Sequence, residues 1–259
     1  MLQDPHLNFA YGGRADFRGR NGAFYTFLSA PGLAVNVKIE EALFTLHDGA
    51  LTVNGSFITE AHVVARGFEN RQVSASFLSE ELDELNSGWQ VVTGSCAGRP
   101  FKFGFHGHKD CLGVKMAMDF SSATFEVGNW TITVHGMPSC RGCLISGPHH
   151  RLDVSFAAHG GAPAIGPPHG LIGQSFATPG VARNGAVDVY PWEGEFTTRA
   201  QAEGAIEGAA DMYQVASPYE TTFAFSVFDA VKREESLASA HDAKSAVDAS
   251  SIEWQHHRR

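Results

Sequence analysis

Short runs that alternate apolar and polar residues recur along most of the chain, and glycine or asparagine occurs at most of the joints between them. Alternation of this kind is typical of a β-strand with one face in water. The runs lie at 23–28, 34–39, 42–46, 50–53, 56–59, 61–65, 89–93, 101–105, 113–118, 123–127, 130–134 and 152–156, and the first of them is rich in aromatic residues. The pattern predicts an all-β fold in which neighbouring strands pair in an antiparallel two-sheet β-sandwich.

Turn residues divide the runs into hairpins. His47-Asp48-Gly49 predicts a hairpin turn, and Asn54-Gly55, the strongest short hairpin signal in the chain, predicts the next one. The opening residues predict a strand, a tight reversal at Gly12-Gly13, a short strand, a second reversal at 18–22 and then a core strand.

Several segments depart from this simple period. Residues 74–85 align Phe77, Leu78, Leu82 and Leu85 and predict either a short helix or an irregular strand, and 159–169 is a proline- and glycine-rich loop. Residues 198–212 have weak helical character, whereas 221–228 alternate like a strand. From 230 the chain is rich in Ala, Glu, Lys and Ser, so we expect a β domain at 1–228 and a C-terminal helical appendage with a disordered end at 229–259.

Composition narrows the class of protein. A hydrophobic content of 43% with 18% charged residues in 259 residues is globular and sufficient for one large β domain. The net charge of −9 argues against a nucleic-acid partner, because no excess of basic residues is there to neutralise phosphates. No apolar run has the length of a transmembrane helix, and the first residues lack the features of a secretory signal.

Two landmarks resemble a known family. Asp4-Pro5-His6, then Gly13, then Asp16-Phe17-x-Gly19 before an aromatic strand, resembles the start of a von Willebrand factor type D domain, especially its cysteine-poor relatives. His169-Gly-Leu-Ile-Gly-Gln174 resembles a segment near the C-terminus of inter-alpha-trypsin inhibitor heavy chains, where type D domains have Gly-Leu-Cys-Gly-Asn. The motif residues are Asp4, Pro5, His6, Gly13, Asp16, Phe17, Gly19, His169, Gly170, Gly173 and Gln174.

The resemblance implies a non-enzymatic extracellular or cell-surface module that associates with other proteins or with matrix. It also implies that the two landmarks meet in space, and that the chain is a fragment of a longer, secreted precursor. Two alternatives stay open. One is a carbohydrate- or ligand-binding β-sandwich in which exposed aromatic residues such as Trp130 and Trp192 line a groove, and the other is a metal-dependent enzyme that uses histidine-rich hairpins. The oligomeric state is left open.

Some type D domains cleave themselves at the Asp-Pro bond of a Gly-Asp-Pro-His motif. Here Gln3 replaces that glycine and restricts the backbone, so we expect Asp4 and His6 to hold a strand and turn by local hydrogen bonds instead. Gly170 and Gly173 are expected to be turn glycines, and Gln174 an amide that joins backbone groups.

Four cysteines suit a disulfide framework. We expect a bridge between neighbouring strands from Cys96 to Cys111, with Cys140 and Cys143 either in a tight bridge or free. Cys140-Arg-Gly-Cys143 also suits two thiolate ligands for zinc. A redox role would need the pair at a helix N-terminus in a βαβ unit, which the flanking sequence does not indicate.

Candidate metal ligands are sparse. His106-Gly-His108 is expected to put two imidazoles on one face of a strand. Type D domains hold calcium just after their glycine-rich landmark, but the matching stretch offers only Asn184 and Asp188, and calcium takes six to eight oxygen ligands. We therefore expect no cofactor. No Gly-x-Ser-x-Gly elbow or phosphate-binding loop occurs, so we expect no enzymatic activity.

Overall fold

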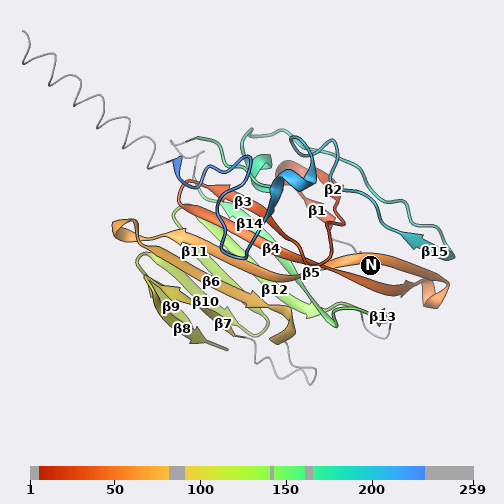
Figure 1. The fold of residues 1–259 in the computed structure, drawn as a ribbon, viewed down its shortest axis with the longest axis horizontal. Coiled ribbons are helices and arrows are strands. Elements are labelled where there is room, and N and C mark those ends of the chain that lie inside the picture. Colours follow the sequence, from red (N-terminus) through yellow and green to blue (C-terminus); the bar gives the residue numbers. More distant parts are fainter. Residues whose placement is uncertain (1–5, 82–90, 141–142, 161–165, 231–259) are drawn as a thin grey trace, which may run out of the picture.

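The computed structural model describes residues 6–81, 91–140, 143–160 and 166–230. The described part is built of β-strands joined by turns and short 3-10 segments, and two antiparallel sheets face one another (Figure 1). The all-β, sandwich-like architecture predicted from the alternation is thus present. None of the helical segments in these ranges has the length and hydropathy of a membrane-spanning helix.

The larger sheet has nine strands. Seven of them follow one another in the order β16 (Gln214–Val215), β3 (Phe24–Ala30), β4 (Leu33–Leu46), β5 (Leu51–Arg66), β6 (Gln72–Leu78), β7 (Val92–Cys96) and β8 (Arg99–Phe103). The other two extend the long β4–β5 hairpin: β13 (Leu144–Ser146) pairs with β4, and β15 (Gly194–Thr197) runs parallel to β5.

The smaller sheet has five strands in the order β14 (His150–Ala158), β12 (Trp130–Pro138), β11 (Ser122–Val127), β10 (Val114–Asp119) and β9 (His108–Cys111). A separate pair, β1 (His6–Asn8) and β2 (Arg14–Asp16), lies at one end of the sandwich (Figure 1). The 3-10 segments are η1 (Ala10–Gly12), η2 (His47–Gly49), η3 (Phe68–Asn70), η4 (Ser79–Glu81), η5 (Gly173–Phe176) and η6 (Ala210–Tyr213).

The core lies between the two sheets. In β10 the side chains of Val114, Met116 and Met118 are buried and the residues between them are exposed, as the alternation predicted. These side chains belong to one cluster of buried residues that takes Phe77 from the large sheet and Ile132 from the small one. Burial of alternate residues from both sheets is what holds the layers together.

The outer face of the large sheet is covered by the chain after β16. Asn36 is fully buried there, and its Nδ2 donates hydrogen bonds to the carbonyl oxygens of Pro218 (2.9 Å) and Glu220 (2.7 Å). Further along, Phe228 packs on Ala34 and Val64. This cover explains why both faces of β4 and β5 are buried near β3.

The predicted hairpin turn at Asn54-Gly55 is wrong. Both residues lie inside β5, opposite Leu43 and Ala42 of β4. The chain reverses at η2 instead, and β4 and β5 stay paired up to that turn. This hairpin buries a second apolar cluster made by Ala42, Phe44, Leu51, Val53 and Phe57.

Other predictions need correction or lie outside the described residues. Residues 221–228 form turns rather than a strand: the Thr221 carbonyl accepts from Ser226 Oγ, the Val227 N–H donates to Ser29 Oγ, and Phe223 packs on the core. Residues 198–212 are mostly irregular, with left-handed glycines at Gly204 and Gly208, and only η6 is helical. Of the stretch 74–85, the residues up to Leu78 are strand and Ser79–Glu81 form η4, while Leu82 and Leu85 lie outside the described residues. The C-terminal helical appendage has no support, since all but its first residues lie beyond the described part of the chain.

Candidate functional site

Within the described residues, β14 forms one edge of the small sheet. Strand β14 pairs with β12 over its whole length, from Pro138 opposite His150 to Trp130 opposite Ala158. No second strand partner for β14 occurs in the parts of the chain that the structure describes. A cavity of about 920 Å³ follows this edge and is lined by every residue from Arg151 to Ala158. The lining of this cavity therefore includes β14 from Arg151 to its end.

The floor of the cavity is apolar and leads towards the core. It is lined by side chains from both sheets and from the η5 region, namely Phe27, Phe57, Ile58, Trp130, Phe156, Ile172 and Phe176. The rings of Trp130 and Phe176 meet edge to face at 5.1 Å. Val154, Phe156 and Phe176 pack on the core but are only partly buried, so apolar surface remains accessible at the mouth.

The opposite wall is formed by β1 and η1, residues 6–11. His6 lies in this wall, and its Nδ1 hydrogen-bonds to Oδ1 of Asp16. The other oxygen of Asp16, Oδ2, accepts from the backbone N–H of Asp188 at 2.7 Å. Because an ionised carboxylate only accepts, His6 donates from Nδ1. The wall therefore holds an imidazole that is oriented by a buried carboxylate.

The second landmark runs along β3. The N–H groups of Leu171 and Ile172 donate to the carbonyl oxygens of Thr26 (3.0 Å) and Phe27 (2.9 Å). Gly170 has φ +103°, and a Cβ there would lie 2.6 Å from the oxygen of Phe27. Only glycine fits this close approach to β3.

Gln174 joins backbone and side-chain groups beneath the cavity. Its Nε2 donates to the Gly170 carbonyl and to the Tyr213 hydroxyl, each at 3.0 Å, and its Oε1 accepts from the N–H of Glu207 at 3.0 Å. Burial raises the pKa of Tyr213 to about 12. This amide network fixes η5, and with it the floor of the cavity.

The two landmarks meet at one end of the cavity. The backbone N–H of Ala10 donates to Oγ of Ser175 at 3.0 Å. Phe17 is fully buried and meets Tyr25 edge to face at 5.0 Å, while Gly19 takes a left-handed conformation at φ +66°. At Gly13 a Cβ would lie 2.1 Å from the Arg183 oxygen.

Asp4 and Pro5 lie outside the described residues, so their expected local role stays a prediction.

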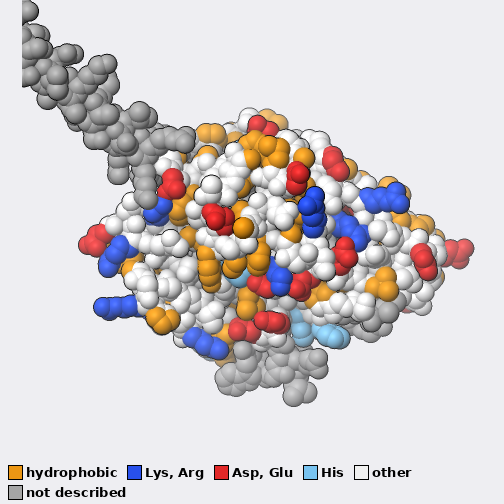
Figure 2. Space-filling model, viewed as in Figure 1, with side chains coloured by type: hydrophobic (Ala, Val, Ile, Leu, Met, Phe, Trp, Pro, Cys, Tyr) orange, Lys and Arg blue, Asp and Glu red, His pale blue; other side chains and the backbone are white. Residues whose placement is uncertain are grey.

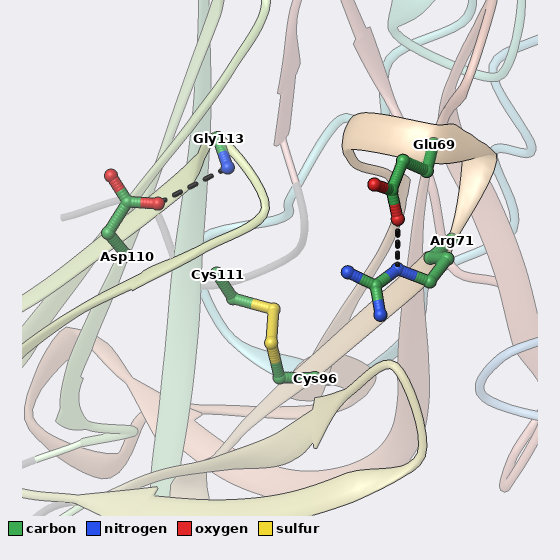
Figure 3. Close-up of a disulfide and its surroundings, with 6 residues drawn as sticks. All are labelled: Glu69, Arg71, Cys96, Asp110, Cys111 and Gly113. Atoms are coloured by element: carbon green, nitrogen blue, oxygen red, sulfur yellow. Dashed lines mark hydrogen bonds and ion pairs between the residues drawn. A yellow bond between two sulfur atoms is a disulfide. The ribbon is translucent and has the colours of Figure 1, made fainter.

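The disulfide expected from Cys96 to Cys111 is present, and of the alternatives for Cys140 and Cys143 the structure has the bridge. Cys96 of β7 and Cys111 of β9 are bonded, with Cα atoms 5.9 Å apart (Figure 3). The bridge does not join neighbours in one sheet, as we expected, but fastens the large sheet to the small one. Cys140 and Cys143 also pair, with Cα atoms 5.4 Å apart.

Two local contacts are drawn around the first bridge in Figure 3. Figure 3 shows Oδ1 of Asp110 accepting from the Gly113 N–H at 3.2 Å across the β9–β10 turn, and Arg71 Nε 3.3 Å from a carboxylate oxygen of Glu69 near η3.

The candidate metal ligands do not converge. His106 has φ +56° in the turn before β9, so it does not share a strand face with His108, and its exposed ring packs on Phe105. Asn184 Oδ1 accepts from the Arg14 N–H at 3.1 Å, and the Asp188 carboxylate accepts from the N–H groups of Arg199 and Ala200. These oxygens bind the backbone around β2. Within the described ranges, no group of three or more His, Cys, Asp or Glu side chains is placed to hold a metal ion.

The two tryptophans proposed for a ligand groove lie apart. Trp130 is buried and lines the cavity. Trp192 is 73% exposed and stacks on His47 of η2, with ring centres 4.3 Å apart. The aromatic pair that the ligand-binding alternative required is therefore absent, although the cavity itself has an aromatic floor.

A polar cluster on the outer face of the large sheet was not foreseen. His62 is buried, and its Nε2 lies 2.9 Å from Oε2 of Glu60 and its Nδ1 2.7 Å from Oγ of Ser76. Ser76 Oγ in turn lies 2.6 Å from the Tyr219 hydroxyl. The hydrogen bond with His62 lowers the pKa of the Glu60 carboxyl, and the hydrogen bond with Glu60 raises the pKa of Lys38.

The pairing register explains this cluster. Asn36, His62 and Ser76 form one cross-strand row over β4, β5 and β6. Each of these strands contributes to the row a single polar residue, which the sequence alone does not mark as part of a cluster. The three residues are recognised as neighbours only once the pairing register of the strands is known. Tyr219 closes the row, so the cluster holds the covering segment to the sheet.

Charges of both signs are interspersed over the face seen in Figure 2, without a large single-sign patch. Comparison of the chain with protein-family models, curated proteins and solved structures gave no match. The likeness to type D domains therefore stays a hypothesis from the two landmarks, and the functional argument depends on the geometry of the β14 edge.

Proposed function

We propose that the protein is a non-enzymatic extracellular or cell-surface module that associates with other proteins by binding an extended segment of its partner along β14. The observation that carries the proposal is the cavity beside an end strand, lined by the whole run from Arg151 to Ala158. An unpaired strand edge offers a row of N–H and C=O groups to a new strand. Strand addition uses these groups for affinity and adjoining pockets for specificity.

The apolar floor suits this mode of binding. A segment that pairs with β14 would lie between β14 and the wall at 6–11, and its inward side chains would cover the partly buried Val154, Phe156 and Phe176. Removal of such apolar surface from water favours binding. The paired cysteines suit an oxidising compartment and support the extracellular part of the proposal.

A second candidate is an apolar small ligand in the same cavity. Its volume of about 920 Å³ falls in the range of small-molecule pockets, and its floor carries five aromatic rings, those of Phe27, Phe57, Trp130, Phe156 and Phe176. A small ligand would not engage the main chain of β14 in a strand-like way, and this difference separates the two candidates.

The test uses the amide groups of a peptide. A peptide as long as β14, nine residues, is selected from a displayed random library on the disulfide-intact protein. Two versions are then made, with the backbone nitrogens methylated at even or at odd positions. Strand addition directs alternate amides towards β14, so one version should bind at least about 10-fold more weakly and the other should bind normally. Equal effects of the two versions would contradict strand addition.

A pair of variants locates the site. Val154→Lys places a charge at the mouth of the cavity, whereas Val189→Lys makes the same change at a side chain that is 80% exposed and does not line it. Selected peptides should lose binding to the first variant and keep binding to the second. A peptide that binds both variants alike would place its site elsewhere.

A further inference from the structure

The two faces of β14 differ in chemistry. In the register with β12, Leu152, Val154 and Phe156 stand opposite Gly136, Val134 and Ile132 and share the face that packs on the core. On the other face, Asp153 and Ser155 stand opposite His135 and Thr133. Side chains alternate along a strand, so a strand added to β14 would present its own residues to the same two environments.

The inner environment contains apolar side chains that remain partly accessible to solvent. Val154, Phe156 and Phe176 are only partly buried, while Trp130 and Ile172 behind them are buried. An added strand would place every second side chain over these residues. Large apolar or aromatic side chains at those positions gain the most from burial.

The outer environment contains one acidic side chain, which already has Arg151 as an ion-pair partner but remains partly exposed. The side chain of Asp153 is 56% exposed, and its Oδ1 lies 3.5 Å from Nε of Arg151. The chain as a whole carries a net charge of −9. A basic side chain directly across from Asp153 would form a favourable cross-strand pair, and an acidic one would be repelled.

Resting on the proposed function, we infer that β14 selects a partner segment of alternating pattern, with apolar or aromatic residues at every second position and a basic residue on the opposite face. The partner is thus a polypeptide that is itself an amphipathic, cationic strand. Strand addition alone requires only an extended main chain, whereas the two faces of β14 also determine which side chains the partner carries.

Three nine-residue peptides with blocked ends test the inference. The first alternates Phe or Val with Lys or Thr, the second has the same composition with its apolar residues contiguous, and the third is the first with Glu in place of Lys. Binding is followed by fluorescence anisotropy of a labelled peptide. We expect the contiguous peptide to bind at least about 10-fold more weakly than the alternating one, because a large apolar side chain then stays in water.

The charge is tested by a swap. Asp153→Lys should reverse the preference, so that the Glu peptide binds more tightly than the Lys peptide, by about 3-fold. Asp119→Lys makes the same change in net charge at an exposed side chain that does not line the cavity and should leave the preference unchanged. An unchanged preference in Asp153→Lys, or the same reversal in both variants, would overturn the basic-residue part of the inference.

The outcomes separate the inference from the proposed function. Equal binding of the alternating and contiguous peptides overturns the inference. Strand addition is still supported if methylation at even and at odd positions of the library-selected peptide weakens binding to different extents. Equal effects of the two methylation patterns would overturn the proposed function itself.

Discussion

The guanidinium of Arg18 joins segments that are far apart in sequence. Its Nη1 donates to the carbonyl oxygens of Asn54 (2.8 Å) and Thr198 (2.9 Å), and its Nη2 donates to Oδ1 of Asn54 (2.9 Å) and to Glu41 (3.0 Å). These bonds fasten the end of β2 to the middle of β5 and to the loop after β15. The planar fork of arginine is needed, because an ammonium group cannot reach the same set of acceptors.

Arg18→Lys is therefore expected to lower the free energy of unfolding by about 2–3 kcal/mol, because buried carbonyl oxygens lose their donors. Urea unfolding of the disulfide-intact protein measures the change. Arg71→Lys, at a side chain that is half exposed, is the control and should change stability by less than about 0.5 kcal/mol. Similar changes in both variants would show that Arg18 does not act as a junction.

His169 is placed to make stability depend on pH. Its ring stacks on Phe225 with centres 4.6 Å apart, its Nδ1 accepts from the Gly170 N–H at 2.9 Å, and Nε2 lies 3.3 Å from Glu207. Burial lowers the pKa of His169 below its usual 6.5, in spite of the opposing effect of Glu207. The folded state thus favours the neutral ring, whose Nδ1 lone pair is in use.

A group with a lowered pKa in the folded state contributes stability above its unfolded pKa, and this stability is lost as pH falls. We expect the urea midpoint to fall as pH decreases from 6.5. His169→Asn should be less stable at pH 8 but should show a weaker decline towards about pH 5. His159→Asn, at an exposed position, should keep the wild-type pH profile. A profile unchanged by His169→Asn would contradict the assignment.

At the scale of elements, the Cys96–Cys111 bridge links β7 of one sheet to β9 of the other. Its sequence separation of 15 residues closes a loop in the unfolded chain, whereas the Cys140–Cys143 pair has a separation of only 3. Disulfides stabilise mainly by restricting the unfolded chain, and more so when the loop is longer.

The double variant Cys96→Ala/Cys111→Ala is expected to lose about 3 kcal/mol of stability. Cys140→Ala/Cys143→Ala should lose less, because its loop is much shorter. Urea unfolding of both variants in parallel measures the difference. The reverse order of the two losses would show that the first bridge does not act by loop closure.

The elements also show how far the sequence alone could reach. The alternating runs identified most of the strands, because period two is a direct consequence of burying one face of a sheet. Asn54-Gly55 failed as a turn because η2 had already reversed the chain and the apolar residues beyond it needed their register. Residues 221–228 failed as a strand because, within the described residues, their main chain bonds to side chains rather than to a neighbouring strand: the Thr221 carbonyl accepts from Ser226 Oγ and the Val227 N–H donates to Ser29 Oγ.

The candidate site was only partly within reach. The sequence singled out His6, Asp16 and the segment 169–174, which prove to line or support the cavity. It did not single out β14, since a strand at the open end of a sheet alternates like any other. Edge position is a property of strand order, and strand order depends on contacts between residues remote in sequence.

At the scale of the whole molecule, the large sheet has a cover. The segment at 217–228 is held by the Asn36 amide, by Tyr219 on Ser76 and by the N–H of Val227, which donates to Oγ of Ser29 at 3.1 Å. Its phenylalanines also pack on the molecule, but no strand ladder holds it, so we expect it to open more readily than the sheet beneath it.

Asn36→Asp removes both amide donors and sets a carboxylate against two carbonyl oxygens. We expect amide hydrogen exchange at 217–228 to increase by at least about 10-fold, while exchange in β10–β12 is unchanged. Hydrogen exchange read by mass spectrometry measures both regions in one sample. Asn70→Asp, at an exposed turn, should alter neither, and a general increase over all strands would contradict a separable cover.

The bridge from Cys96 to Cys111 lies near one margin of the small sheet, and β14 forms the opposite margin. If the two sheets rotate slightly relative to one another, the disulfide makes its own margin the axis, and the largest displacement occurs at β14. A pulling force on a segment bound at β14 would therefore separate the sheets most effectively there. Reduction of the disulfide would remove this fixed axis and weaken the hold on the bound segment.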